Sequence, residues 1–357
     1  MYRDGAAEGS GTIRELVRQY RDAARDKAAS LRARGDLRLF DITMLGSTGT
    51  GKTTLLASMY ERFDEVIGAT DLAIIPEHLT SVKLNEYINF LQKMPRTVEV
   101  RYGIPGTGDI REYRLGVGRK GKASMLTLRF TDYPGKYLIS DEMNAEKEAV
   151  LRALTRADVI LVAIDAPALM ERHGKYHRVV NQPSLIRDQI KTMLTADEAR
   201  LIILVPLKCE RYVGTQEGAR QLAERVLKEY EPLLNFIRSG DVRSRVGCVL
   251  APAQTVGSVV FSTVTEMEAG HPVFEYRSRT ANATYQPVDT DQSLRYALRF
   301  IVNKYRIDKR GIFPRIWQVA FGTDAALVGA VDDFAAGCKD DGIFQVVQGH
   351  DFLRPGG

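Results

Sequence analysis

GSTGTGKT, at Gly46–Thr53, matches the pattern G-x-x-x-x-G-K-[ST] of a phosphate-binding loop. It follows Leu37–Leu45, which is predicted to be a strand, and it precedes helical periodicity from Thr53 to Phe63. Glycines let a backbone wrap closely around phosphate oxygens, and the N-terminus of the helix adds partial positive charge. A glycine-rich turn without a ligand would not require the Lys-Thr pair. The pattern therefore predicts that a nucleoside triphosphate binds here.

The side chains of this loop have distinct expected roles. Lys52 places a full charge beside the β- and γ-phosphates, and the Thr53 hydroxyl is expected to ligate Mg²⁺. Contacts to phosphate through backbone amides are expected from the remaining members of the segment: Gly46, Ser47, Thr48, Gly49, Thr50, Gly51 and Thr54.

A second signal is the tetrapeptide DYPG, which follows the predicted strand ending at Thr131. An aspartate at the tip of a strand beside a phosphate loop can hold Mg²⁺ through water, which is the role expected of Asp132. Gly135 can offer its backbone N–H to a γ-phosphate. The alternative is an aspartate that only forms a turn at the end of a strand.

A third signal lies at the end of the predicted strand Arg200–Leu207, in the sequence VPLKCE. Lys208 and Glu210 have the spacing of the guanine motif [NT]-K-x-D, in which the lysine stem covers the base and the carboxylate accepts two guanine protons. Leu207 replaces Asn or Thr here, and glutamate, one methylene longer, replaces aspartate. Guanine is therefore the expected base and adenine the alternative, and an ordinary surface Lys/Glu pair stays open. Ala251, in APAQ after the next strand, is expected to offer a backbone N–H to guanine.

The first-switch threonine that binds Mg²⁺ is expected at Thr97, in the segment Met94-Pro95-Arg96-Thr97. Arg96 would stabilise charge in the transition state. A plain proline-containing turn is the alternative.

Strand and helix patterns alternate along the chain, and they predict an α/β fold with a doubly wound, mostly parallel sheet. Apolar runs at Asp158–Asp165, Arg200–Leu207 and Arg245–Leu250 suit strands that are buried on both faces. Expected helices separate or follow the strands: Leu79–Leu91, Glu142–Arg156, Ser184–Leu194, Gln216–Ile237, Gln292–Tyr305 and Ala325–Phe334. Expected hairpins are Glu112–Val117 with Ser124–Thr131, and Val256–Thr265 with Val273–Tyr276. The expected organisation is an N-terminal amphipathic helix within 1–36, a nucleotide-binding domain at 37–306 with a hairpin insertion at about 256–290, and a C-terminal extension at 307–357.

The order GSTGTGKT, DYPG, LKCE and APAQ resembles translation-factor-like and Ras-like GTPases over about residues 37–255. More narrowly, PRT, DYPG, PLKCE, APAQTVG and DQSLRYALRF resemble the bacterial double-GTPase (DO-GTPase) families. The resemblance implies the fold of a P-loop GTPase, a GTP/GDP-dependent molecular switch, and a link to prokaryotic conflict and defence systems.

Hydrolysis is expected to be slow, because Lys136 stands where Ras-like proteins have a glutamine that orients water. A charged lysine cannot accept a hydrogen bond from water. A protein partner, an activator or homodimerisation is then expected to complete the site. An ATPase or ATP-dependent phosphotransferase is the alternative function, and a scaffold that binds nucleotide without turnover is another.

Composition indicates a folded protein: 44% of the 357 residues are hydrophobic and the net charge is +5. The basic residues form no platform with interleaved aromatic residues, so nucleic-acid binding is not expected. No membrane span or secretory signal is visible, and the three cysteines are far apart, so a cytoplasmic location is expected. His173 and His177 are interpreted as a surface pair rather than a metal site.

Overall fold

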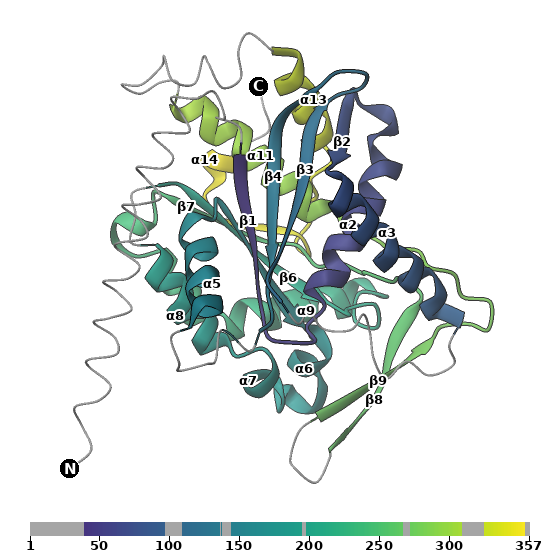
Figure 1. Cartoon of the computed structure of the whole chain (residues 1–357). Coiled ribbons are helices and arrows are strands. Elements are labelled where there is room, and N and C mark those ends of the chain that lie inside the picture. The colour runs from purple at the N-terminus through teal and green to yellow at the C-terminus, as the bar shows by residue number, and fades with distance from the viewer. Residues whose placement is uncertain are drawn as a thin grey trace.

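The computed structural model describes residues 39–96, 109–135, 137, 144–194, 198–266, 272–308 and 325–353. Its centre is an eight-stranded sheet in the order β10-β7-β6-β5-β1-β4-β3-β2, with helices on both faces (Figure 1). The strands are β1 (Leu39–Leu45), β2 (Leu72–Pro76), β3 (Arg111–Arg119), β4 (Ser124–Asp132), β5 (Val159–Asp165), β6 (Arg200–Leu207), β7 (Val246–Leu250) and β10 (Gln345–Gln348).

The middle of the sheet is parallel: β4, β1, β5, β6 and β7 all run in one direction. The remaining pairings, of β3 with β4, β2 with β3, and β10 with β7, are antiparallel. Because the carboxyl ends of parallel strands meet at one edge, the loops that follow β1, β4, β5, β6 and β7 come together there. This edge holds the motifs GSTGTGKT, DYPG, LKCE and APAQ.

Two hydrophobic cores cover the two faces of the sheet. Along β5, residues 159, 161 and 163 belong to one core and residues 160, 162 and 164 to the other, which explains the continuous apolar run. The first core packs against α2 (Lys52–Val66), α3 (His78–Lys93), α11 (Asp291–Asp308) and α13 (Ala325–Ala335). The second packs against α5 (Ala145–Arg156), α8 (Pro183–Met193), α9 (Gln216–Glu229) and α10 (Glu231–Ile237).

Shorter helices complete the chain. They are α6 (Ala166–Met170), α7 (His177–Val180), α14 (His350–Leu353) and the 3₁₀ turns η1 (Ile67–Ala69), η2 (Met94–Arg96), η3 (Glu171–Gly174) and η4 (Gly240–Val242). Among the residues that the structure describes, no helix combines the length and the apolar character needed to cross a bilayer.

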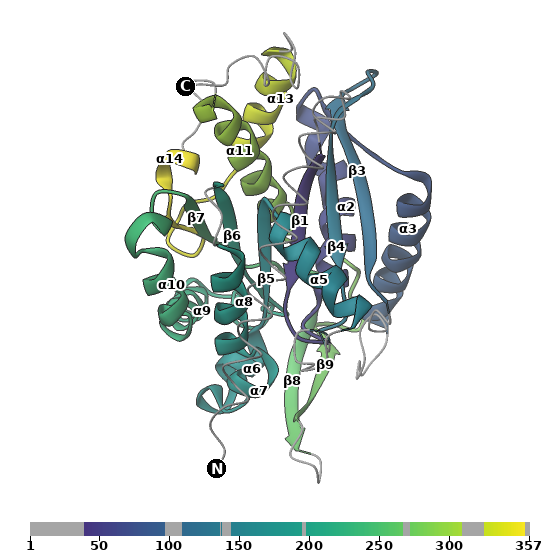
Figure 2. The same cartoon turned by 60° about the vertical axis from the view of Figure 1, so that its left-hand side comes forward.

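The predicted hairpin after β7 forms a separate two-stranded sheet of β8 (Val259–Glu266) and β9 (Pro272–Ser278). Figures 1 and 2 show that it projects from the end of the sheet at which the parallel strands finish. The hairpin therefore lies on the side of the molecule that carries the motifs.

The α/β fold with a mostly parallel sheet is as predicted, and two details differ. The expected helix Gln216–Ile237 is two helices, α9 and α10, because Pro232 cannot donate a helical hydrogen bond and occupies the first turn of α10. Strands β2 and β10 were not predicted, and both extend the edges of the sheet. The predicted N-terminal helix lies outside the described residues.

Candidate nucleotide-binding site

The phosphate loop joins β1 to α2. Gly49 and Gly51 have positive φ angles of 82° and 103°, a backbone conformation that residues with a Cβ adopt only with strain. Gly51 precedes the first residue of α2, and its carbonyl accepts the backbone N–H of Leu55 at 2.8 Å. The glycines therefore allow the strand to turn directly into a helix whose N-terminus faces the loop.

Lys52 is enclosed by this loop. Its side chain is almost fully buried, and Nζ donates to the carbonyl oxygens of Gly46 at 2.8 Å and Ser47 at 3.1 Å. Burial lowers the pKa of Lys52 to about 8, and the negative charge of Asp132 opposes that shift. The ammonium group is thus held at the centre of the loop, in an environment that favours a nearby anion.

Asp132, the last residue of β4, contacts the first turn of α2. Its Oδ2 accepts a hydrogen bond from Thr53 Oγ1 at 2.6 Å, and its Oδ1 is buried without a hydrogen-bond partner among the described residues. Burial raises the pKa of Asp132, whereas the Thr53 hydrogen bond and the charge of Lys52 lower it. A carboxylate and a hydroxyl oxygen side by side fit Mg²⁺, which prefers oxygen ligands and takes the rest of its shell from phosphate and water.

The DYPG segment lies directly on the phosphate loop. A Cβ placed on Gly135 would lie 2.6 Å from the carbonyl carbon of Ser47 and would also collide with the backbone nitrogen of Thr48. Only glycine fits at this distance. The preceding Tyr133 is fully buried in the core, which anchors the segment against the sheet.

Lys208 connects the loop after β6 to the phosphate loop. Its Nζ donates to the carbonyl oxygen of Gly49 and to Asp165 Oδ2, each at 2.7 Å. Lys208 has a positive φ of 55°, an uncommon backbone conformation that a residue with a Cβ adopts at some cost. The motif LKCE is therefore fixed beside the phosphate loop.

Glu210 is buried, so it does not belong to an ordinary surface ion pair. Its Oε1 accepts from the backbone amides of Val256 and Gly257, both at 3.3 Å, in the loop between β7 and β8. Burial raises the pKa of Glu210, and hydrogen bonds from backbone amides oppose that shift. The carboxylate is held between the two loops that the sequence assigned to base recognition.

Residues 41–262, more than half of the chain, match the family described as Double-GTPase 2 (DO-GTPase2). The chain belongs to the Double-GTPase 2 family. The resemblance predicted from the motifs is thereby confirmed at the level of the family.

Solved structures similar to this Double-GTPase 2 protein include the signal recognition particle receptor SRb-GTP/SRX complex from Chaetomium thermophilum. The identity is 13%, the TM-score is 0.36, and the match covers 61% of this chain and 92% of that one. The Ski7 GTPase-like domain of S. cerevisiae, bound to GTP, matches at 12% identity with a TM-score of 0.32, over 61% of this chain and 43% of that one. No curated protein matches the sequence.

One predicted site residue has its backbone amide engaged within the sheet, and three others lie wholly or in their side chains outside the described part of the chain. The N–H of Ala251 donates to the carbonyl of Leu204 at 2.9 Å, within the sheet, so the structure offers no free amide there for a base. Arg96 is the last residue of η2, and its side chain lies outside the described part of the chain, as do Thr97 and Lys136. The roles of these residues remain predictions.

The Double-GTPase 2 chain also has site residues that the sequence did not reveal. Asp165, at the end of β5, holds Lys208 and caps α6 by accepting from the amide of Ala168 at 2.9 Å. The side chain of Asn181 binds both backbone groups of Asp165 and also His177. His177 is buried, so its interpretation as a surface residue was wrong. The only signal for Asp165 was its position at the end of a strand.

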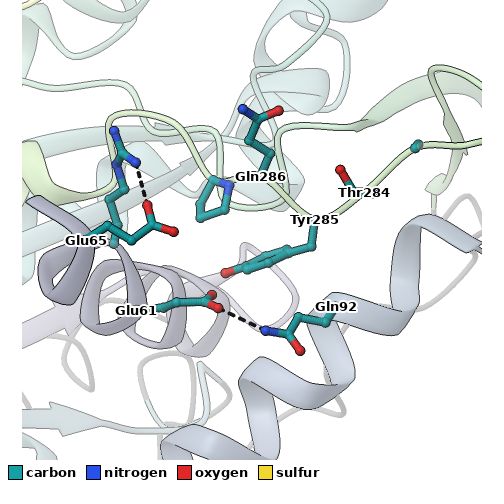
Figure 3. A pocket seen from close by; sticks show the side chains of 9 residues that line it. Glu61, Glu65, Gln92, Thr284, Tyr285 and Gln286 are labelled. Carbon is teal, nitrogen blue, oxygen red and sulfur yellow. Dashed lines mark hydrogen bonds and ion pairs between the residues drawn. The ribbon is translucent and has the colours of Figure 1, made fainter.

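Two hollows of about 490 and 420 Å³ lie elsewhere, along α2 and α3. Figure 3 shows the first, where Tyr285 points towards Glu61 and Gln92 binds Glu61. Its lining is polar, and no motif of the sequence contributes to it. The nucleotide site is instead an open edge built from loops.

Proposed function

We propose that this protein binds GTP with Mg²⁺ at the phosphate loop, hydrolyses it slowly, and acts as a molecular switch. The observation that carries the proposal is the convergence of two separate motifs, DYPG and LKCE, on the phosphate-loop motif. Thr53 contacts Asp132, Gly135 lies against Ser47, and Lys208 binds Gly49. Membership of the Double-GTPase 2 family supports the same reading.

At the phosphate end of the nucleotide, each residue of the site has one proposed role. Lys52 and the loop amides would bind the β- and γ-phosphates, because they supply positive charge within a buried setting. Thr53 and Asp132 would hold Mg²⁺, with Thr97 as the third proposed ligand. The ion would neutralise charge on the phosphates when bound. Gly135 would donate its amide to the γ-phosphate, which makes its segment sensitive to hydrolysis.

The base side rests on Lys208 and Glu210. The lysine would cover one face of the base, and the carboxylate would accept two protons that guanine has and adenine lacks. Glu210 is buried at the junction of two loops, which supports a role inside a pocket rather than at the surface. ATP remains the alternative ligand, and a scaffold without turnover the alternative function.

Catalysis by the isolated chain is proposed to be weak. Lys136 offers only donors, and orienting a water molecule requires an acceptor. A partner or a second copy would supply the missing group, and Arg96 is the proposed source of positive charge. A setting in a bacterial defence or signalling complex is part of this proposal and rests on the motif resemblance alone.

The switch is tested by hydrogen exchange, read by mass spectrometry, in the GDP state and with a non-hydrolysable GTP analogue. We expect peptides that contain Gly135 or Thr97 to exchange several-fold more slowly with the analogue, because a γ-phosphate would bind their amides. A peptide from the buried strand β6 serves as the internal control. Equal exchange in the two states, with both nucleotides bound, would support the scaffold instead.

A further inference from the structure

The hairpin β8–β9 lies outside the main sheet but contacts the base side of the site. The ring centre of Tyr276, on β9, lies 5.5 Å from Lys208 Nζ. Arg279, just after β9, donates through Nη2 to the backbone carbonyl of Glu210 at 2.5 Å. Lys208 and Glu210 of the LKCE motif are therefore contacted by β9 and by the residue that follows it.

Tyr276 is placed by packing rather than by its hydroxyl. Its ring meets Phe261 of β8 edge-on, with centres 6.2 Å apart and an interplanar angle of 77°. The hydroxyl oxygen is buried and has no hydrogen-bond partner among the described residues. Burial, with the negative charges of Asp165 and Glu210, raises the pKa of Tyr276 well above its usual range, so the phenol is neutral. The aromatic ring, and not the hydroxyl, is thus the part of Tyr276 that contacts Lys208 and Phe261.

Lys208 is consequently held from three directions. Gly49 lies on the phosphate loop, Asp165 at the end of β5, and Tyr276 on the hairpin. A cation within about 6 Å of a ring centre is attracted by the π-system. All three contacts are made with the ammonium group, and removing the ring would leave that group with two of them.

We propose that Tyr276 is a positioning residue for nucleotide selection: its ring holds Lys208 so that the lysine stem covers the guanine base. The inference rests on the proposed function. It extends the site beyond the main sheet, because the hairpin then contributes to base recognition through Lys208.

The test compares the parent with Tyr276→Leu, Tyr276→Phe and Phe274→Leu by titration calorimetry. Phe274 is a matched control, because its ring also packs on Phe261 from β9, whereas its other aromatic contact is with Tyr176 and not with the LKCE loop. The ligands are GTP and inorganic tripolyphosphate, both with Mg²⁺. We expect Tyr276→Leu to weaken GTP binding by about two- to thirtyfold, the range of a cation–π contact. Tripolyphosphate binding should stay unchanged, and Tyr276→Phe should bind GTP within about twofold of the parent.

Three outcomes overturn the inference. They are unchanged GTP affinity in Tyr276→Leu, an equal loss of GTP and tripolyphosphate affinity, and an equal loss of GTP affinity in Phe274→Leu. Melting curves identify any variant that has failed to fold. If Tyr276→Leu fails to fold, Tyr276→Phe provides the test, because a loss of GTP affinity in that variant as large as the loss expected for Tyr276→Leu would contradict a role for the ring. A parent that does not bind GTP would instead reject the proposed function itself.

Discussion

At the scale of single residues, the site combines charges that the fold has placed in low-dielectric surroundings. Lys52 and Asp132 are both buried, and each opposes the shift that burial imposes on the other. Burying two such charged groups costs free energy of folding unless further partners interact with their charges. A nucleotide with Mg²⁺ would add both a cation and anions at this point, which explains why these residue types stand here.

His177 gives a prediction about pH. Because Asn181 Oδ1 accepts from the amide of Asp165, the Nδ2 group of Asn181 donates to His177 Nδ1 at 3.0 Å, which leaves the ring proton on Nε2. Burial lowers the pKa of His177, with Glu229 opposing and Arg225 and Arg178 reinforcing the shift. The neutral ring therefore stabilises the fold above the unfolded pKa of about 6.5, and this contribution is lost as the pH falls below it.

We expect the free energy of unfolding of the parent to fall by at most about 1.4 kcal/mol per pH unit below 6.5 through this residue. His177→Phe, which keeps a ring beside Tyr230, should lack that component. The free energy of unfolding of the parent minus that of the variant, which is the stability gap, should therefore decrease towards pH 5.5. Urea unfolding at several pH values measures the gap. A gap that is independent of pH would show that His177 does not titrate in this range. His173→Phe, at an exposed position, is the control.

The sequence predicted the residues that act through local pattern and missed those that act through tertiary contact. Lys52, Thr53 and Asp132 stand in short motifs that lie at the ends of recognisable strands. Tyr276 contacts Lys208 across 68 positions of the chain, and no local pattern marks such a pair. No local pattern marks Asn181 either, because its role depends on hydrogen bonds to the backbone of Asp165, which is distant in the sequence.

At the scale of elements, a hydrogen bond between Thr53 and Asp132 joins the first turn of α2 to the end of β4. Thr53→Ala removes the hydroxyl from the proposed Mg²⁺ shell and leaves Lys52 in place. We expect GTP affinity in the presence of Mg²⁺ to fall towards the value measured with EDTA, while affinity in EDTA stays close to that of the parent. Thr54→Ala is the control on the same turn. Equal dependence on Mg²⁺ in the Thr53 variant and the parent would exclude Thr53 as a ligand.

The strands of the main sheet that the sequence predicted are nearly continuous apolar runs, as in β5 and β6, or alternating segments, as in β3 and β4. Strand β2, LAIIP, has only five residues and ends in proline, and β10 has four, so neither gives a clear pattern. Each is stabilised as a strand by antiparallel pairing with a neighbour: β2 pairs with β3, and β10 pairs with β7. Edge strands of this kind are fixed by the sheet that they join.

At the scale of the whole molecule, we expect a slow enzyme whose catalytic site is completed by a second protein or a second copy of the chain. We predict a single-turnover rate of about 10⁻⁴ to 10⁻² per second for the isolated chain, the range of unassisted switch GTPases. If dimerisation completes the site, the rate rises with protein concentration, and Arg96→Ala reduces that rise. Fast turnover that does not depend on concentration would show that the chain already holds a complete catalytic group.

We propose that the phosphate loop and the Lys208–Glu210 pair together select a guanine nucleotide. Calorimetric titration of the purified protein with GTP and with ATP at equal Mg²⁺ measures this selectivity, with Lys52→Ala as the control that should lose both ligands. We expect GTP to bind at least about tenfold more tightly than ATP, and Glu210→Ala to lose most of that margin. Equal affinity of the parent for GTP and ATP would show that the site does not select the base.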